Sequence, residues 1–209
     1  MKKLIVVLLL AIPASSMAQV WYIGPKTGVT FSNYKSRTPW KEVTNIGFTA
    51  GLNAYTQIRN NFGLGFEVQY IQKGYYHKIC NTITDQLDAN YLEVPVLADY
   101  SFLIPGLKNF KGHANAGFYS AYWLSGKYRM EGYDTPSEEF DFSKSKTRRF
   151  DFGPLAGGRL EYIFRNGSLS LDFRYELGML DLQDSSNDNT RNTNKAFILG
   201  ISYLRILNF

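Results

Sequence analysis

Apolar and polar residues alternate one by one along most of the chain. Between residues 44 and 58, Ile46, Phe48 and Leu52 occupy even positions, whereas Asn45 and Asn53 occupy odd positions. Successive side chains of a β-strand point to opposite faces, so this period of two predicts a strand with one apolar and one polar face. After residue 19, no sustained helical spacing of apolar residues occurs.

Eight segments carry this alternation, and most exceed the usual soluble strand of about 5–6 residues. A tilted strand that crosses a membrane needs ~9–11 residues, and bacterial outer-membrane barrels have an even number of strands. The pattern therefore predicts a membrane barrel. The eight segments are residues 21–33, 44–58, 62–74, 90–102, 113–126, 149–164, 169–182 and 196–209.

The connections between the segments alternate in length. Residues 59–61, 103–112 and 165–168 are short, whereas residues 34–43, 75–89, 127–148 and 183–195 are long and polar. Periplasmic turns are short and extracellular loops long in outer-membrane barrels. The sequence thus predicts an all-β, eight-stranded antiparallel up-and-down transmembrane β-barrel with both termini in the periplasm.

The first 18 residues read as a secretory signal peptide. Lys2 and Lys3 precede an apolar stretch over residues 4–12, which is too short to span ~30 Å of hydrocarbon as a helix. A small-x-small site places the cleavage between Ala18 and Gln19. We therefore predict two parts, a signal peptide over residues 1–18 and an outer-membrane β-barrel domain over residues 19–209.

The charged residues of the predicted strands occupy the alternate positions that form the polar face, and nine glycines occupy such positions too. We call this alternation of positions the parity of a strand. Eight strands leave only enough room for side chains, so these charges would form a packed structural network in a closed lumen. The alternative is a soluble periplasmic ligand-binding barrel, in which the apolar face points inward and the charges coat the outside. The predicted lumenal network comprises Glu67, Glu93, Asp99, Asp151, Arg159, Glu161, Asp172, Arg174 and Glu176.

The C-terminal segment alternates up to a terminal aromatic residue. Tyr203, Leu207 and Phe209 resemble the recognition signal by which the barrel assembly machinery binds outer-membrane barrels, although Arg205 interrupts the pattern. Aromatic residues near strand ends suit interfacial girdles at the membrane surfaces. The candidates for these girdles are Trp21, Tyr22, Tyr75, Tyr76 and Trp123.

Several segments together resemble the small outer-membrane β-barrel proteins (porin family, PorT-type) of Bacteroidetes-like bacteria. They are residues 24–33 (GPKTGVTFSN), 65–74 (GFEVQYIQKG), 91–97 (YLEVPVL), 152–158 (FGPLAGG) and 173–178 (FRYELG). The resemblance covers the whole chain after the signal peptide. It implies a fold and an outer-membrane location, and no shared catalytic residue comes with it.

Composition excludes several classes of function. Removal of Lys2 and Lys3 with the leader lowers the formal net charge from +5 to +3, too little and too scattered for nucleic acid. The single cysteine, Cys80, excludes a disulfide scaffold, and His77 and His113 are isolated in the sequence. We therefore predict no metal, no cofactor and no catalytic residue.

The sequence thus predicts a non-enzymatic outer-membrane protein with a structural or loop-mediated adhesion role. The alternatives are an accessory component of an envelope or protein-secretion machine, the soluble periplasmic barrel and, last, an outer-membrane enzyme of the lipase or protease type. The expected partners are outer-membrane lipid and lipopolysaccharide, the barrel assembly machinery, and an envelope protein that binds the extracellular loops. Loop 127–148 mixes charges with aromatic residues and is either a solvated loop or a strand-like extension that meets lipopolysaccharide phosphates or a partner protein.

Overall fold

The computed structural model describes residues 20–35, 41–78, 84–131, 138–142, 147–180 and 193–208. The expected signal peptide and Phe209 lie outside these residues. The strands are β1 (Val20–Lys35), β2 (Lys41–Val43), β3 (Asn45–Arg59), β4 (Phe62–Lys78), β5 (Thr84–Leu103), β6 (Phe110–Glu131), β7 (Glu138–Glu139), β8 (Phe150–Phe164), β9 (Gly167–Leu177) and β10 (Thr193–Asn208).

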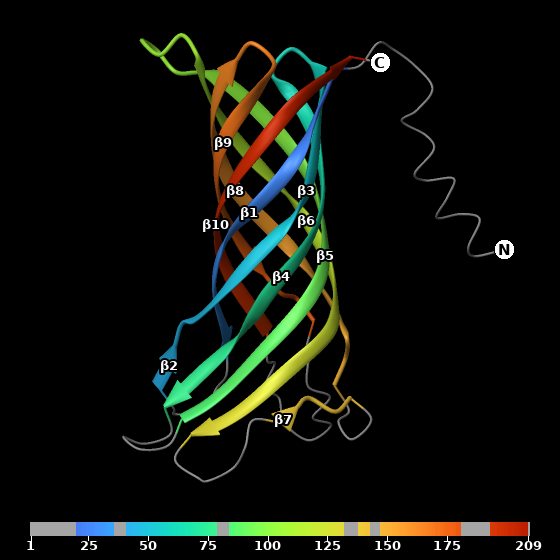
Figure 1. The fold of residues 1–209 in the computed structure, drawn as a ribbon, viewed down its shortest axis with the longest axis vertical. Helices are drawn as coiled ribbons and strands as arrows, with labels where there is room; N and C mark the ends of the chain where they lie inside the picture. Colours follow the sequence, from blue (N-terminus) through green and yellow to red (C-terminus); the bar gives the residue numbers. More distant parts are fainter. Residues whose placement is uncertain are drawn as a thin grey trace, which may run out of the picture.

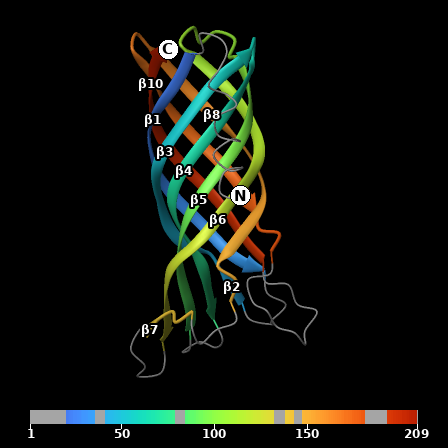
Figure 2. The same ribbon diagram turned by 90° about the vertical axis from the view of Figure 1, so that its right-hand side faces the viewer.

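Eight long strands form a closed antiparallel ring. Each pairs with its neighbour in the order β1, β3, β4, β5, β6, β8, β9, β10, and β10 pairs with β1 to close the barrel. Figures 1 and 2 show the strands tilted around one axis, with the C-terminus at the end that carries the short turns. The eight strands predicted from the alternation are confirmed, and β2 and β7 are short additions at the opposite end.

The short turns use residues that tolerate a left-handed backbone. Asn60 has a φ of 46° in the two-residue turn between β3 and β4, and Gly106 has a φ of 84° in the turn between β5 and β6. Asparagine and glycine adopt this conformation at low cost, which fixes tight antiparallel hairpins. We call this end of the barrel the short-turn end and the other end the long-loop end.

The wall has an apolar outer face and a polar inner face. On β9, Leu171 and Phe173 are 44% and 49% exposed, whereas Arg174 between Phe173 and Tyr175 is 2% exposed. A belt of exposed apolar side chains with charges on the inside is stable only where the outer solvent is hydrocarbon. The apolar-inside arrangement of the soluble alternative is therefore wrong.

Among the described residues, no helix has the length and apolar character needed to cross a membrane.

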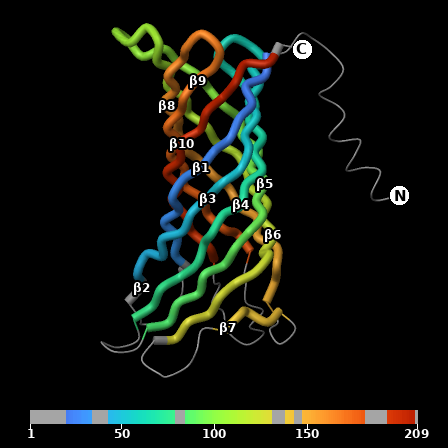
Figure 3. Tube along the Cα trace, viewed as in Figure 1, coloured from blue at the N-terminus to red at the C-terminus, as the bar shows by residue number. Residues whose placement is uncertain are grey.

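The wall is taller on one side, and its polarity reverses in the taller part. Figures 1 and 3 show β4, β5 and β6 reaching furthest at the long-loop end. On β5 the outward residues are apolar from Leu92 to Phe102, but from Thr84 to Asn90 the outward positions are polar and the inward Leu87 and Ala89 are buried. This is the pattern of a sheet in water, so we call β4–β6 beyond Tyr91 the extension.

A β-bulge sets the side-chain directions in the extension. Tyr91 pairs with Trp123 but Asn90 pairs with Ser125, so Leu124 has no partner on β5. The extra residue shifts the parity of β6, because side chains alternate with a period of two. As a result Lys127 and Arg129 are exposed on the outside rather than buried.

The prediction that residues 75–89 and 127–148 are loops throughout is wrong in part. β4 continues to Lys78, β5 begins at Thr84 and β6 continues to Glu131, with β7 at residues 138–139. β2 pairs with the edge of β4, and β7 pairs with the edge of β6. These short strands cover edges that would otherwise present unpaired backbone groups to another sheet.

Aromatic residues do form a belt on the outer wall, but three of the five predicted members, Tyr22, Tyr75 and Trp123, pack inside the barrel instead. At the short-turn end, ring pairs link Phe62 to Tyr100 and Phe110 to Tyr162, each with centroids 5.0 Å apart. Trp123, one of the predicted girdle residues, is only 2% exposed and lies inside the barrel. Its parity on β6 is that of Tyr119 and Ala121, which are also buried.

The polarity of the wall predicts the effect of a charge on its outer face. We expect Leu171→Arg, at the middle of β9, to lower the free energy of unfolding in lipid vesicles by about 2–4 kcal/mol, because the guanidinium would face the bilayer centre. Leu177→Arg at the strand end should cost about 0–1 kcal/mol. Urea titrations measure both values, and equal costs at the two depths would contradict this placement of the bilayer.

Candidate functional site

All nine residues of the predicted charge network are buried inside the barrel. Their exposed fractions run from 0% to 7%. Side chains from every strand of the ring fill the interior, because eight strands enclose little more than side-chain volume. One buried member per strand, in ring order, is Lys26, Tyr55, Glu67, Glu93, Tyr119, Asp151, Arg174 and Ser202.

Glu67 on β4 is the most connected charge of the interior. Arg174 on β9 donates to both of its carboxylate oxygens, from Nη1 at 2.9 Å and from Nη2 at 2.6 Å. Lys26 Nζ on β1 lies 3.1 Å from Oε2, and Tyr55 Oη on β3 donates to Oε1 at 2.6 Å. These contacts tie β1, β3 and β9 to β4 across the lumen. A fork-to-fork arginine–carboxylate pair is among the stronger polar contacts in proteins.

A second cluster surrounds Lys73 on β4. Lys73 Nζ lies 2.6 Å from Glu93 Oε2 and 2.7 Å from Glu176 Oε2. The same ammonium is 4.3 Å from the ring centroid of Tyr119, whose hydroxyl donates to Asp151 at 3.0 Å. One cation is thus shared by carboxylates from β5 and β9.

A third cluster lies at the short-turn end and centres on His113. Its Nδ1 is 2.8 Å from Asp99 Oδ2, and its Nε2 is 3.0 Å from Glu161 Oε2. Arg159 approaches the same imidazole, with Nη2 3.0 Å from Nδ1, and its Cζ is 3.9 Å from the ring centroid of Tyr55. These groups line a recess of ≈ 430 Å³, which includes space open to solvent.

The geometry of the third cluster is that of an ion-pair cluster. The hydroxyl of Ser168 donates to Glu161 rather than to His113, so the imidazole has no hydroxyl nucleophile within this set. Asp172, the remaining predicted charge, accepts a hydrogen bond from Ser202 at 3.0 Å. Within the described residues, no three His, Cys, Asp or Glu side chains are arranged to hold a metal ion.

Three basic members of these clusters, Lys26, Lys73 and His113, are absent from the predicted network. Lys26 and Lys73 are 4% and 1% exposed, and His113 is 8% exposed. All three share the inward parity of their strands, which is a signal that the sequence contains. Lys73 and His113 lie near the ends of the predicted segments 62–74 and 113–126, where a basic side chain suits the membrane surface as well as the lumen.

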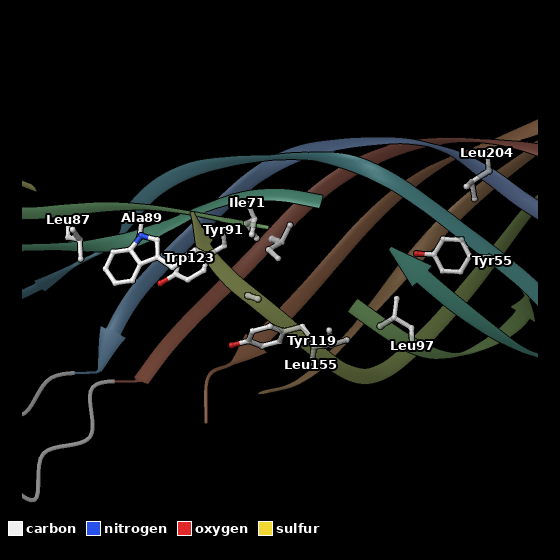
Figure 4. Close-up of a cluster of buried hydrophobic side chains, with 12 residues drawn as sticks. Tyr55, Ile71, Leu87, Ala89, Tyr91, Leu97, Tyr119, Trp123, Leu155 and Leu204 are labelled. Carbon is white, nitrogen blue, oxygen red and sulfur yellow. The ribbon is translucent and has the colours of Figure 1, made fainter. Parts of the chain in front are cut away.

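An aromatic cluster fills the barrel at the long-loop end. Trp123 stacks on Tyr91 and on Phe140, with centroid distances of 5.8 and 4.8 Å, and meets the edge of Phe142 at 5.1 Å. Figure 4 shows Trp123 and Tyr91 beside Leu87 and Ala89, far along the barrel from Tyr55 and Leu204. The chain after β7 thus folds back against the interior. Arg149 covers this segment with its Cζ 3.8 Å from the Phe142 ring centroid.

The C-terminal signal is placed only in part. Tyr203 is 42% exposed on the outer wall and Leu207 is partly buried, whereas Phe209 lies outside the described residues. Its recognition by the assembly machinery stays a prediction.

The comparisons with known proteins agree with this architecture. A family model described as "Outer membrane protein beta-barrel domain" matches residues 17–184. Comparison with curated protein sequences finds no match.

Three solved structures of similar fold have low sequence identity. Ail, the attachment invasion locus protein of Yersinia pestis, is 17% identical, with 90% of this chain and 99% of that chain covered and a TM-score of 0.48. Neisserial surface protein A is 14% identical over 88% and 96% of the two chains, with a TM-score of 0.48. The outer membrane enzyme PagL is 12% identical over 84% and 97%, with a TM-score of 0.45.

The Glu67 cluster predicts a large effect of breaking one buried ion pair. We expect Arg174→Met to lower the free energy of unfolding by about 3–5 kcal/mol, because it leaves the Glu67 carboxylate buried with less compensation. The double variant Glu67→Gln/Arg174→Met should cost less than the sum of the two single variants. The exposed Arg148→Met serves as the control and should change stability by less than about 0.5 kcal/mol. Equal costs for Arg174→Met and Arg148→Met would contradict this role.

Proposed function

The chain belongs to the family of outer membrane protein β-barrel domains, and on this premise we propose that it is a non-enzymatic outer-membrane barrel whose long-loop end contacts a partner outside the cell. The interior serves as a rigid structural core. The exposed surface of the extension provides the specificity of the contact.

The reversal of polarity in the extension carries this proposal. Its outer face presents Lys127 and Arg129 beside polar groups of β5, while its inner face is packed with Leu87 and the aromatic cluster. Such a sheet is stable in water and holds its outer side chains in fixed positions. Its covered edges disfavour pairing with other sheets, so the partner would bind the face of the sheet rather than extend it.

The ends of the barrel support an orientation. β1 begins and β10 ends at the short-turn end, and the longer connections and the extension lie at the other. Outer-membrane barrels expose short turns to the periplasm and long loops to the outside. We therefore assign the short-turn end to the periplasm.

The interior clusters support a non-enzymatic role. Glu67, Glu93 and Glu176 each contact a buried cation, and their residues are at most 1% exposed. A substrate entering from solvent would have to displace these ion pairs. Their chemistry is that of packing and charge compensation.

A second candidate is an accessory component of an envelope or protein-secretion machine. The recess beside His113 favours it, because on the proposed orientation this recess opens to the periplasm. The narrower resemblance to PorT-type barrels stays a prediction, and it would point to the same role.

Labelling of single cysteines tests the orientation. In a Cys80→Ser background, we expect Arg129→Cys on the extension to react with a membrane-impermeant maleimide on intact cells. Lys108→Cys in a short turn should react only after the outer membrane is permeabilised. The opposite order of labelling would reverse the assignment.

Binding by the purified barrel tests the contact surface. We expect wild-type protein in lipid nanodiscs to bind members of an array of glycans and matrix proteins, and Lys127→Glu/Arg129→Glu to bind them at least tenfold more weakly. The charge-conserving variant Lys127→Arg/Arg129→Lys is the control.

A deletion strain should secrete its proteins normally, and accumulation of exported cargo in its periplasm would instead support the second candidate.

A further inference from the structure

Four exposed basic side chains surround the short-turn end. Three lie in or beside the hairpin turns, and the fourth lies where β10 pairs with β1. Arg59 lies at the β3–β4 turn, Lys108 in the β5–β6 turn, Arg165 in the β8–β9 turn, and Arg205 on β10 beside β1. We call these four residues the basic collar. Because the ring order is β1, β3, β4, β5, β6, β8, β9, β10, the collar is distributed around the whole rim.

Among the described residues of the short-turn end, no exposed acidic side chain neutralises the positive charge of the collar. Among the described residues of the short-turn end, the only carboxylates are Asp99 and Glu161, and both are buried in the lumen with His113. The long-loop end differs, since Lys127 on β6 is opposite Asp88 on β5 and Glu139 on β7. Within the described part of the chain, the exposed positive charge of the short-turn rim is therefore uncompensated.

Each collar residue adjoins an aromatic residue of the outer wall. The four neighbours are Phe62, which pairs with Arg59, Phe110, two residues after Lys108, Phe164, directly before Arg165, and Tyr203, two residues before Arg205. Rings of this belt contact one another, and Phe164 and Tyr203 lie 5.9 Å apart. Aromatic residues of barrels gather at the level of the lipid headgroups. The collar thus begins at the level where lipid phosphates lie.

We propose that the basic collar binds anionic phospholipid headgroups of the periplasmic leaflet. The identity of the leaflet rests on the orientation proposed above. Arginine matches the planar arrangement of phosphate oxygens with two parallel donors, and lysine acts as a point charge. One Lys or Arg near an anionic lipid surface gives about a fivefold preference at 25 °C. Four such sites fix the depth and tilt of the barrel.

Electron spin resonance of labelled lipids tests the collar directly. The full mature protein is reconstituted in phosphatidylcholine vesicles with a trace of spin-labelled phosphatidylglycerol or phosphatidylcholine. We expect the motionally restricted lipid at the wild-type barrel to favour phosphatidylglycerol, with an average ratio between one and the fivefold value of a single site, because the shell also includes lipids away from the collar. The ratio should fall as salt rises from 0.05 to 0.5 M. The quadruple variant Arg59→Gln/Lys108→Gln/Arg165→Gln/Arg205→Gln should bring the ratio close to one.

A matched variant removes the same number of charges from the other end. Lys78→Gln/Lys127→Gln/Arg129→Gln/Arg148→Gln should retain most of the preference. Should the quadruple variant fail to fold, Lys108→Gln/Arg165→Gln lies in turns outside the strands and should remove about half of the excess of the ratio over one. A wild-type ratio near one, or equal losses in the two quadruple variants, would overturn the proposal. Because vesicles present the lipid in both leaflets, this result is independent of the labelling test of orientation.

Discussion

The buried contact of Glu67 with Arg174 and Lys26 is the interaction on which the rest of the structure depends. A wall that meets hydrocarbon must place its polar side chains in the lumen, and eight strands make that lumen narrow. Charges confined there are tolerated only when they are paired and hydrogen-bonded. The clusters around Glu67, Lys73 and His113 meet this condition. Each also connects strands that are not neighbours in the ring, the third through Arg159 on β8 and Asp99 on β5. The paired charges therefore fill and stabilise the interior of the barrel, as apolar side chains do in a water-soluble protein.

Beyond the membrane the wall must suit water instead of lipid. From Tyr91 toward the long-loop end, the outward residues of β5 change from apolar to polar while the strand keeps its direction. β6 needs one extra residue, Leu124, to bring its charges outward at the same height. The aromatic cluster around Trp123 then forms a small conventional core. The barrel thus has one part that suits lipid and one part that suits water, and the change occurs along β5 and β6.

The sequence predicted the ring well because a period of two reports the alternation of faces directly. The eight strands and the burial of charges such as Arg174 and Glu176 follow from parity alone. The extension was harder to predict. Leu87 and Asn90 keep the period of two, but here the apolar residue points inward and the polar residue points outward, the reverse of the membrane part. Trp123 was misplaced for a different reason. A tryptophan near a strand end suits a membrane surface, but its position has the inward parity of Tyr119 and Ala121, and residues 140–142 pack against it.

The height of the extension has a consequence for biogenesis. On the proposed orientation, a protein inserted from the periplasm must carry its long-loop end across the bilayer first. That end holds Lys127 and Arg129 on one face and backbone that is satisfied only when β4, β5 and β6 are already paired. Passage of these groups through acyl chains imposes a kinetic barrier that grows with the length of the polar segment. Spontaneous insertion should therefore be slow even though the final state is stable, and a catalyst that thins the bilayer would lower that barrier.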